Sequence, residues 1–519
     1  MYVGNKRITV PVLCLIISLA IGAYLRLHNI SQYMTFLGDE GRDVLVVKRM
    51  IVDHKFTLLG PTASVGGFFM GPIYYYFMLP FLWLWNLDPV GPAIMVALFG
   101  LLTVLLVYLL GQALFDSWVG LMAAVLYSFS PFIIAYSRSS WNPNIVPFFA
   151  TLLMYSLWRF YESRRMRWLF VSGVCIGIGV QLHYVFLFLI PVATIWTAQI
   201  CRTKQLLLSG LVAIFGVIVG IAPFLAFEVR HGFPNTISIF RFITSSEDTG
   251  LNISHALVVM GDVLYRLFGR LLFRLPDQGV FELMSKNMQV FWRQGIVIII
   301  LACILVLMGL IIKRSKEKIT IVQAQAAKLL LLWCVLPLIC FGFYKKAIYD
   351  YYFGIFYPTP FLFLAILLGS IGSRLLGKVF ATAALLLLLW YFWQGRPFLF
   401  TPNNQLGQVK KISETAMGFT GGMPFNFALI TGGNSDHAYR YFFEIWGNAP
   451  PVIENYVNDP ERKTVTGQLI VICETNECKP LGHPLWEIAG FGRAEIVKET
   501  DMQFVKILKL QHYTSDRTL

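Results

Sequence analysis

A run of charged residues follows the first apolar segment of the chain. It spans positions 38–43 and reads Gly38, Asp39, Glu40, Gly41, Arg42 and Asp43. A carboxylate in such a place can act as a general base toward a hydroxyl or an amine, and an arginine can hold a phosphate. The glycines allow a tight backbone from which Asp39 or Glu40 points into a cleft. The alternative is a solvated loop in which Asp39 or Asp43 caps the helix that follows.

Other polar residues interrupt apolar segments farther along the chain. The polar turn 136–144 offers Arg138 as a contact for an anion or a lipid headgroup, and Asn142 as a cap for the next helix. His183 lies where two half-length helices meet, either as a ligand contact or as a hydrogen-bonded structural residue. Further candidates lie at outward turns, where they line a cleft, contact a phosphate or merely end a helix: Glu228, Arg230, His231, Lys345 and Lys346.

Several familiar signatures are missing from the sequence. There is no Walker A motif, no Rossmann glycine fingerprint and no HExxH pattern. We therefore expect no metal site and no resident cofactor, and leave a divalent metal open. Cys473 and Cys478 form a disulfide only if their region is extracytoplasmic, which the sequence does not decide. In the run 435–437 (Ser-Asp-His), Ser435 or Asp436 is interpreted as the N-cap of a helix over 438–446, and the run is not interpreted as a hydrolase triad.

The composition is that of a polytopic membrane protein. Of the 519 residues, 57% are hydrophobic and only 13% are charged. These values exclude a disordered chain, a secreted disulfide scaffold and an ordinary cytosolic enzyme. The net charge of +14 resides in short loops between apolar runs, which is the positive-inside pattern. The positive charge therefore indicates how the chain is oriented in a lipid bilayer. It does not indicate a nucleic-acid partner.

The apolar segments predict roughly eleven to thirteen transmembrane helices, each needing about 20 residues. The candidate segments are 8–27, 71–86, 93–115, 119–136, 143–162, 168–181, 183–200, 206–229, 294–313, 328–344, 353–372 and 377–394. The first is interpreted as an uncleaved anchor. The short segment 71–86 is the first candidate for a re-entrant segment, and 256–275 is an alternative thirteenth span.

The chain is predicted to divide into two domains. Residues 1–396 form a transmembrane catalytic domain whose long outer loops, 28–70 and 230–293, each carry an amphipathic stretch suited to the membrane interface. Residues 397–519 form a small extracytoplasmic α/β domain, with strands expected at 427–430, 469–472 and 503–510. The fold class is therefore a polytopic α-helical membrane protein with a C-terminal α/β domain.

The pattern resembles the GT-C membrane glycosyltransferases, and within them glycosyltransferase family 39. That family includes protein O-mannosyltransferases and lipid A aminoarabinose transferases. The resemblance covers roughly residues 8–230, and the chain departs from it at Met70-Gly71, where many members carry a charged residue or a histidine before a Pro-Pro pair. The matching motifs are Asp39-Glu40 with Arg42, the stretch Gly71-Pro72-Ile73-Tyr74-Tyr75-Tyr76, and Ser130-Pro131 with Ser137-Arg138.

The resemblance implies a sugar donor linked to a polyprenyl phosphate. Asp39, together with Glu40, would supply the base for an acceptor hydroxyl that attacks the anomeric carbon with inversion. The acceptor, a lipid, a glycan or a protein hydroxyl, stays unspecified. Phosphate contacts are assigned to Arg42, Arg138, Arg230, Lys345 and Lys346. The substrate cleft is assigned to Asp43, Tyr74, Asn142, His183, Glu228 and His231.

Two other classes of function remain open. One is a transporter or flippase of a lipid-linked glycan, for which paired repeats and ionisable residues deep within spans are expected. The other is a non-catalytic scaffold that binds envelope glycans. In all three cases we expect an integral membrane protein whose active site and C-terminal domain are extracytoplasmic. The absence of targeting signals favours the cytoplasmic membrane of a prokaryote.

Overall fold

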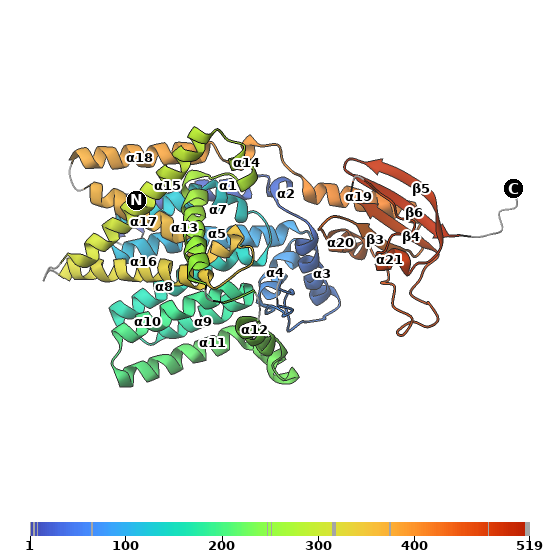
Figure 1. Cartoon of the computed structure of the whole chain (residues 1–519), viewed down its shortest axis with the longest axis horizontal. Coiled ribbons are helices and arrows are strands. Elements are labelled where there is room, and N and C mark those ends of the chain that lie inside the picture. The colour runs from blue at the N-terminus through green and yellow to red at the C-terminus, as the bar shows by residue number, and fades with distance from the viewer. Residues whose placement is uncertain are drawn as a thin grey trace. The chain divides into compact units, whose positions relative to one another are not determined.

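The structure is a computed structural model, shown in Figure 1, and it describes residues 2–3, 6–7, 9–63, 66–245, 248–250, 252–313, 318–372, 375–475 and 477–513. Contacts divide the chain into two compact units. The first comprises Met1–His28, Thr57–Phe77 and Ala93–Thr401, and the second comprises Asn29–Phe56, Met78–Pro92 and Pro402–Leu519. The sequence predicted one domain up to residue 396 and a second from residue 397, so it placed residues 29–56 and 78–92 in the first domain. The contacts group these two segments with the C-terminal part. The predicted division into domains stays a prediction.

The first unit is helical apart from a short antiparallel pair, β1 (Tyr2–Val3) and β2 (Lys6–Arg7). Helix α4 runs from the first unit into the second, and α5 runs back. The helices are α1 (Val10–Leu27), α4 (Ile73–Leu84), α5 (Val90–Leu114), α6 (Ser117–Phe129), α7 (Pro131–Tyr136), η1 (Asn142–Ile145), α8 (Val146–Ser163), α9 (Arg167–Leu182), η2 (Tyr184–Leu189), α10 (Ile190–Ile200), α11 (Thr203–His231), α12 (Pro234–Ser245), α13 (Ile253–Phe273), α14 (Gln278–Glu282), α15 (Lys286–Ile312), α16 (Lys318–Gly342), η3 (Asp350–Phe356), α17 (Pro358–Ile371), α18 (Leu375–Trp393) and η4 (Pro397–Leu399).

Within the described residues, six helices are long and apolar enough to cross a membrane, or up to seven if the bent pair η3 and α17 counts as one span. Several predicted segments are shorter or broken because prolines interrupt them. One example is 119–136, which divides into α6 and α7 at Ser130 and Pro131. The alternative span 256–275 corresponds to α13, which is not among the six. The fold class, a polytopic helical membrane protein with a small C-terminal sheet domain, is confirmed.

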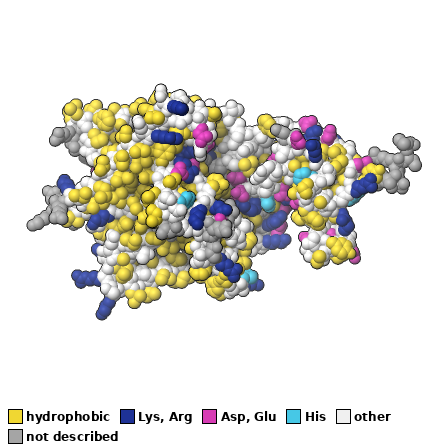
Figure 2. Space-filling model, viewed as in Figure 1, with side chains coloured by type: hydrophobic (Ala, Val, Ile, Leu, Met, Phe, Trp, Pro, Cys, Tyr) yellow, Lys and Arg dark blue, Asp and Glu magenta, His cyan; other side chains and the backbone are white. Residues whose placement is uncertain are grey.

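Helices α9 and α11 pack closely through glycines four positions apart on each helix. An added Cβ at Gly177 would lie 2.5 Å from the carbonyl oxygen of Val217, and one at Gly220 would lie 2.6 Å from that of Val174. Such small-residue pairs let two helix backbones approach where lipid gives no hydrophobic drive for association. Figure 1 shows α9 and α11 side by side, and Figure 2 shows hydrophobic side chains over much of the visible face of this unit.

The second unit contains a four-stranded sheet in the order β3-β4-β6-β5. Strand β3 is parallel to β4, and the remaining pairs are antiparallel. The strands expected at 427–430, 469–472 and 503–510 correspond to β3, β4 and β6, whereas β5 was not predicted. The elements are α2 (Ile30–Tyr33), α3 (Gly38–Val52), α19 (Gln405–Thr420), β3 (Asn426–Ile430), α20 (His437–Ile445), β4 (Gln468–Cys473), α21 (Trp486–Ala489), β5 (Ala494–Met502) and β6 (Val505–His512).

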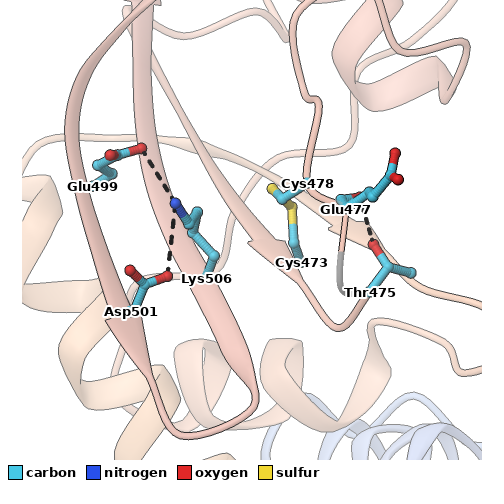
Figure 3. The surroundings of a disulfide bond; sticks show 7 residues. All are labelled: Cys473, Thr475, Glu477, Cys478, Glu499, Asp501 and Lys506. Atoms are coloured by element: carbon cyan, nitrogen blue, oxygen red, sulfur yellow. Dashed lines mark hydrogen bonds and ion pairs between the residues drawn. A yellow bond between two sulfur atoms is a disulfide. The ribbon is translucent and has the colours of Figure 1, made fainter.

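A disulfide joins Cys473, the last residue of β4, to Cys478 (Figure 3). The sequence left this bond open, and the structure contains it. Thr475 donates a hydrogen bond to the Glu477 carbonyl within the closed loop, at 3.0 Å. Nearby, Lys506 of β6 pairs with Glu499 and Asp501 of β5 (Figure 3).

Candidate active site

The first turn of α3 carries the carboxylates that the sequence singled out. Leu37 is the N-cap residue, so the predicted caps, Asp39 and Asp43, are wrong. Glu40 reaches back instead, and its Oε2 accepts a hydrogen bond from the Leu37 backbone N–H at 3.0 Å. Only 6% of Glu40 is exposed. Burial raises the pKa of Glu40 to about 7, because a charged carboxylate loses its hydration there.

Arg42 joins the other two carboxylates of this turn. Its Nη1 lies 2.8 Å from Asp39 Oδ1, and its Nη2 lies 2.8 Å from Asp43 Oδ1. The Asp39 side chain is 55% exposed, whereas that of Asp43 is fully buried. Of the three carboxylates, Asp39 is therefore the one that an outside group can reach.

The two glycines of the motif are required by a neighbouring helix. A Cβ on Gly41 would overlap the backbone nitrogen of Ala438 in α20, and one on Gly38 would lie 2.8 Å from the backbone nitrogen of Ser435. The start of α3 thus rests directly on the start of α20, and Figure 1 shows the two helices side by side. The sequence explained these glycines by a tight turn; the structure explains them by close approach.

His437 is the residue near this turn that sequence reasoning set aside. Its Nδ1 lies 2.8 Å from Ser435 Oγ, and the charges of Arg42 and Asp39 act on it. Burial lowers the pKa of His437, since the charged ring is poorly hydrated. Asp436 is the N-cap residue of α20, as predicted, although its side chain makes no capping bond and instead pairs with Arg440. Sequence alone gives no signal that this helix start meets α3.

A second polar group lies in the first unit, around η1 and the end of α9. The hydroxyls of Tyr74 and Ser140 are 2.8 Å apart, and Asn142 Nδ2 donates to the Leu182 carbonyl at 2.6 Å. The Asn142 bond brings η1 next to His183, whose ring centroid lies 4.8 Å from that of Tyr352. Tyr74, Asn142 and His183, all assigned to the substrate cleft, are thus in one neighbourhood of the first unit.

Arg138 is held by the end of α1. Its Nη1 and Nη2 donate to the carbonyls of Leu25 and His28, each at 2.7 Å, and 2% of the residue is exposed. Phe398 covers the guanidinium at 5.6 Å. These contacts satisfy carbonyls at a helix C-terminus, where a positive charge is favourable. They account for two of the three guanidinium nitrogens of Arg138, and its phosphate contact stays a prediction.

Glu228 is likewise occupied by a neighbouring helix end. The carboxylate accepts hydrogen bonds from the backbone and side chains of Asn235 and Thr236, at 2.7–3.2 Å, and only 1% of Glu228 is exposed. It therefore satisfies the free N–H groups at the start of α12. His231 stacks on Phe227 with centroids 4.1 Å apart. The contacts support the alternative in which these residues end one helix and start the next.

The remaining predicted cations are exposed in the first unit. Lys346 Nζ pairs with Asp248 at 3.0 Å while 56% of its side chain stays exposed, and Arg230 and Lys345 are also exposed. Asp350, which the sequence did not assign, pairs with Arg266 at 3.1 Å and with Arg270 at 2.8 Å. Across the described ranges, no group of three or more His, Cys, Asp or Glu side chains is arranged to hold a metal ion.

Residues 70–227 match the protein family described as dolichyl-phosphate-mannose-protein mannosyltransferase. Among solved structures, the chain is similar to apo ArnT from Cupriavidus metallidurans, with 13% identity, a TM-score of 0.53, and coverage of 95% of this chain and 97% of that one. It is also similar to the archaeal oligosaccharyltransferase AglB from Archaeoglobus fulgidus, with 13% identity, a TM-score of 0.51, and coverage of 98% and 74%. The search of curated proteins gives no match.

These similarities define the fold. It is the fold of the GT-C membrane glycosyltransferases, so the resemblance to the mannosyltransferase and ArnT type that the motifs indicated is confirmed. The protein is an integral membrane protein with this fold.

Proposed function

We propose that the protein transfers a sugar from a polyprenyl-phosphate donor to a hydroxyl acceptor, with Asp39 as the general base. The observation that carries this proposal is the difference in exposure within one helix turn. Asp39 is 55% exposed and paired with Arg42, while Glu40 and Asp43 are buried. Support for the donor class comes from the fold, because the AglB structure of similar fold is a complex with dolichol-phosphate.

In the proposed reaction, Asp39 removes the proton from the acceptor hydroxyl as its oxygen attacks the anomeric carbon. The bond from that carbon to the phosphate oxygen breaks, and the polyprenyl phosphate leaves with the electron pair. Attack opposite the leaving group inverts the anomeric centre. In this proposal Glu40 is not the main base, because it is only 6% exposed and its carboxylate accepts a hydrogen bond from the Leu37 backbone N–H. This narrows the sequence prediction, which kept Glu40 beside Asp39.

The developing phosphate charge needs cations. Arg42 pairs with the proposed base, although its guanidinium is shared between Asp39 and Asp43. The phosphate contacts assigned to Arg230, Lys345 and Lys346, three exposed cations of the first unit, stay predictions. No step of this chemistry requires a resident cofactor, and a divalent metal stays an open prediction.

The proposed site of action is outside the cytoplasm. The disulfide between Cys473 and Cys478 supports this side for the second unit, because such bonds persist in oxidising compartments. The basic loops between the apolar runs are expected on the cytoplasmic side, because short cytoplasmic loops carry an excess of Lys and Arg. The prokaryotic cytoplasmic membrane remains the predicted location.

The test is sugar transfer in membranes, with a panel of radiolabelled polyprenyl-phosphate sugars. Asp39→Asn should lower kcat by about 10²–10⁴-fold, the usual contribution of a general base. Asp53→Asn is the matched control: it removes a carboxylate at the other end of α3, 3.7 Å from Lys48, and should leave kcat near that of the wild type.

Two other results would redirect the proposal. Equal transfer by the wild type and Asp39→Asn would place the base elsewhere. A folded wild type that transfers no sugar from any donor would favour the transporter or the scaffold.

A further inference from the structure

Asn434 connects the start of α3 to the sheet of the second unit. Its Oδ1 accepts hydrogen bonds from the backbone N–H groups of Gly38 and Ser435, both at 2.9 Å. Gly38 is the first residue of α3, so its N–H has no partner within the helix. The cap for the turn that carries Asp39 therefore comes from a residue 396 positions later.

Asn434 is itself fixed by Glu474, the residue after β4. Asn434 Nδ2 donates to Glu474 Oε1 at 3.1 Å and to Oε2 at 3.2 Å. The same carboxylate accepts from the hydroxyls of Thr431 and Tyr439, each at 2.8 Å. Three side chains thus hold Glu474, whose backbone N–H continues the strand pairing to Ile430 at 2.8 Å. The amide of Asn434 has little freedom to turn.

The other end of α3 is attached differently. Lys48 and Arg49 pair with Glu444 at the end of α20, at 3.1 and 2.9 Å. These long side chains keep α3 alongside α20 but lie about three helical turns from Asp39. The place of the first turn depends on Gly38, Asn434 and Glu474, which we call the Asn434 clamp.

We propose that Asn434, held by Glu474, is a positioning residue for the base. The clamp sets where Asp39 stands relative to an incoming acceptor, and it does so without touching substrate. This inference rests on the proposed function. A displacement of about 1 Å in a reacting group can cost about 10²-fold in rate, so a loosened first turn should lower kcat more than it raises KM.

The experiment combines kinetics with hydrogen exchange on the purified full chain. Asn434→Ala should lower kcat by tenfold or more, with donor KM within about threefold, and should speed amide exchange across residues 36–43. Asn426→Ala is the matched control. Asn426 is a buried amide of β3 whose hydrogen bonds go to Pro451, Thr464 and Thr466. The Asn426→Ala variant should have a lower melting temperature than the wild type. Its amide hydrogen exchange at residues 36–43 and its kcat per folded molecule should be unchanged.

A paired variant tests Glu474 within the clamp. Asn434→Asp keeps an acceptor for Gly38 but sets a carboxylate against Glu474, so it should lose activity. Adding Glu474→Gln restores a donor between the two side chains and should recover part of kcat. A double variant no better than Asn434→Asp alone overturns the assignment of Glu474.

The two readouts separate this inference from the proposed function. Unchanged exchange at residues 36–43 in Asn434→Ala overturns the clamp, whatever the activity. Faster exchange with unchanged kcat overturns its role in positioning the base, as does an equal loss of kcat in Asn426→Ala. If the wild type transfers no sugar at all, the proposed function fails, and with it the link to catalysis, while exchange still decides whether Asn434 holds α3.

Discussion

Two regions of the molecule use charged side chains in opposite ways. In the first unit, Arg138 and Glu228 are almost wholly buried. Arg138 donates hydrogen bonds to carbonyls at the end of α1, and Glu228 accepts them from N–H groups at the start of α12. In the second unit, the first turn of α3 leaves Asp39 exposed beside a buried neighbour of the same charge. A buried charge with satisfied hydrogen bonds holds structure, whereas an exposed carboxylate that is held in place is available for chemistry. Charge near a membrane does not by itself distinguish the two.

Among the stability changes predicted here, the loss of the buried carboxylate of Glu228 should give the largest. Glu228→Ala leaves the N–H groups of Asn235 and Thr236 without their acceptor, at a cost of about 3 kcal/mol or more. Sugar transfer per folded molecule should stay within about threefold of the wild type. Thermal unfolding and the transfer assay measure the two effects. A variant that keeps its melting temperature but loses transfer would move Glu228 to the functional side.

Glu40 lies between the two classes, because it is buried but makes only a local backbone bond. Its pKa is about 7 in the folded protein against an ordinary 4.5, so the folded state holds a proton that the unfolded state has lost between these values. Stability should therefore fall as pH rises from about 4.5 to 7, by on the order of 3 kcal/mol, and level off above that range.

Glu40→Gln should remove this slope, since the amide oxygen still accepts from Leu37 and carries no charge. Melting temperatures across pH 4.5–8 for the wild type and the variant provide the measurement. Identical pH profiles for the two proteins would show that Glu40 titrates as an ordinary carboxylate.

The disulfide should give the smallest effect of the three. Cys478→Ser opens a short loop, and the chain-entropy account of such loops gives about 2 kcal/mol. The loss should fall on the second unit, with the helices of the first unit unchanged in hydrogen exchange. Because Glu474 adjoins Cys473, a modest rise in exchange at residues 36–43 is also expected. An exchange increase confined to the first unit would contradict this assignment.

The sequence predicted local features well where one helix or strand decides them. The helix expected at 438–446 is α20, which begins and ends one residue earlier. Strand β5 was missed because its residues are largely exposed and charged, such as Glu495, Lys498 and Glu499, so no apolar run marks it.

The environment of the candidate site lay beyond the reach of sequence. The order of residues 38–43 indicated chemistry, but which carboxylate is exposed depends on α20, far away along the chain. The stretch 44–51 was interpreted as a helix at the membrane interface, yet Val44, Val47 and Met50 are buried and α3 packs along α20. An amphipathic pattern shows that a face is covered without showing what covers it.

The distance along the chain between Gly38 and Asn434 has a consequence for biosynthesis. At about 5–20 residues per second, the ribosome needs about 20–80 s to reach Asn434 after it has made Gly38. During that time the charged turn has crossed or met the membrane without its partner. A chain interrupted after residue 43 and before Asn434 would carry every residue of the motif and still lack the hydrogen bond from Gly38 to Asn434. The first turn of α3 therefore acquires this hydrogen bond only after residue 434 has been synthesised.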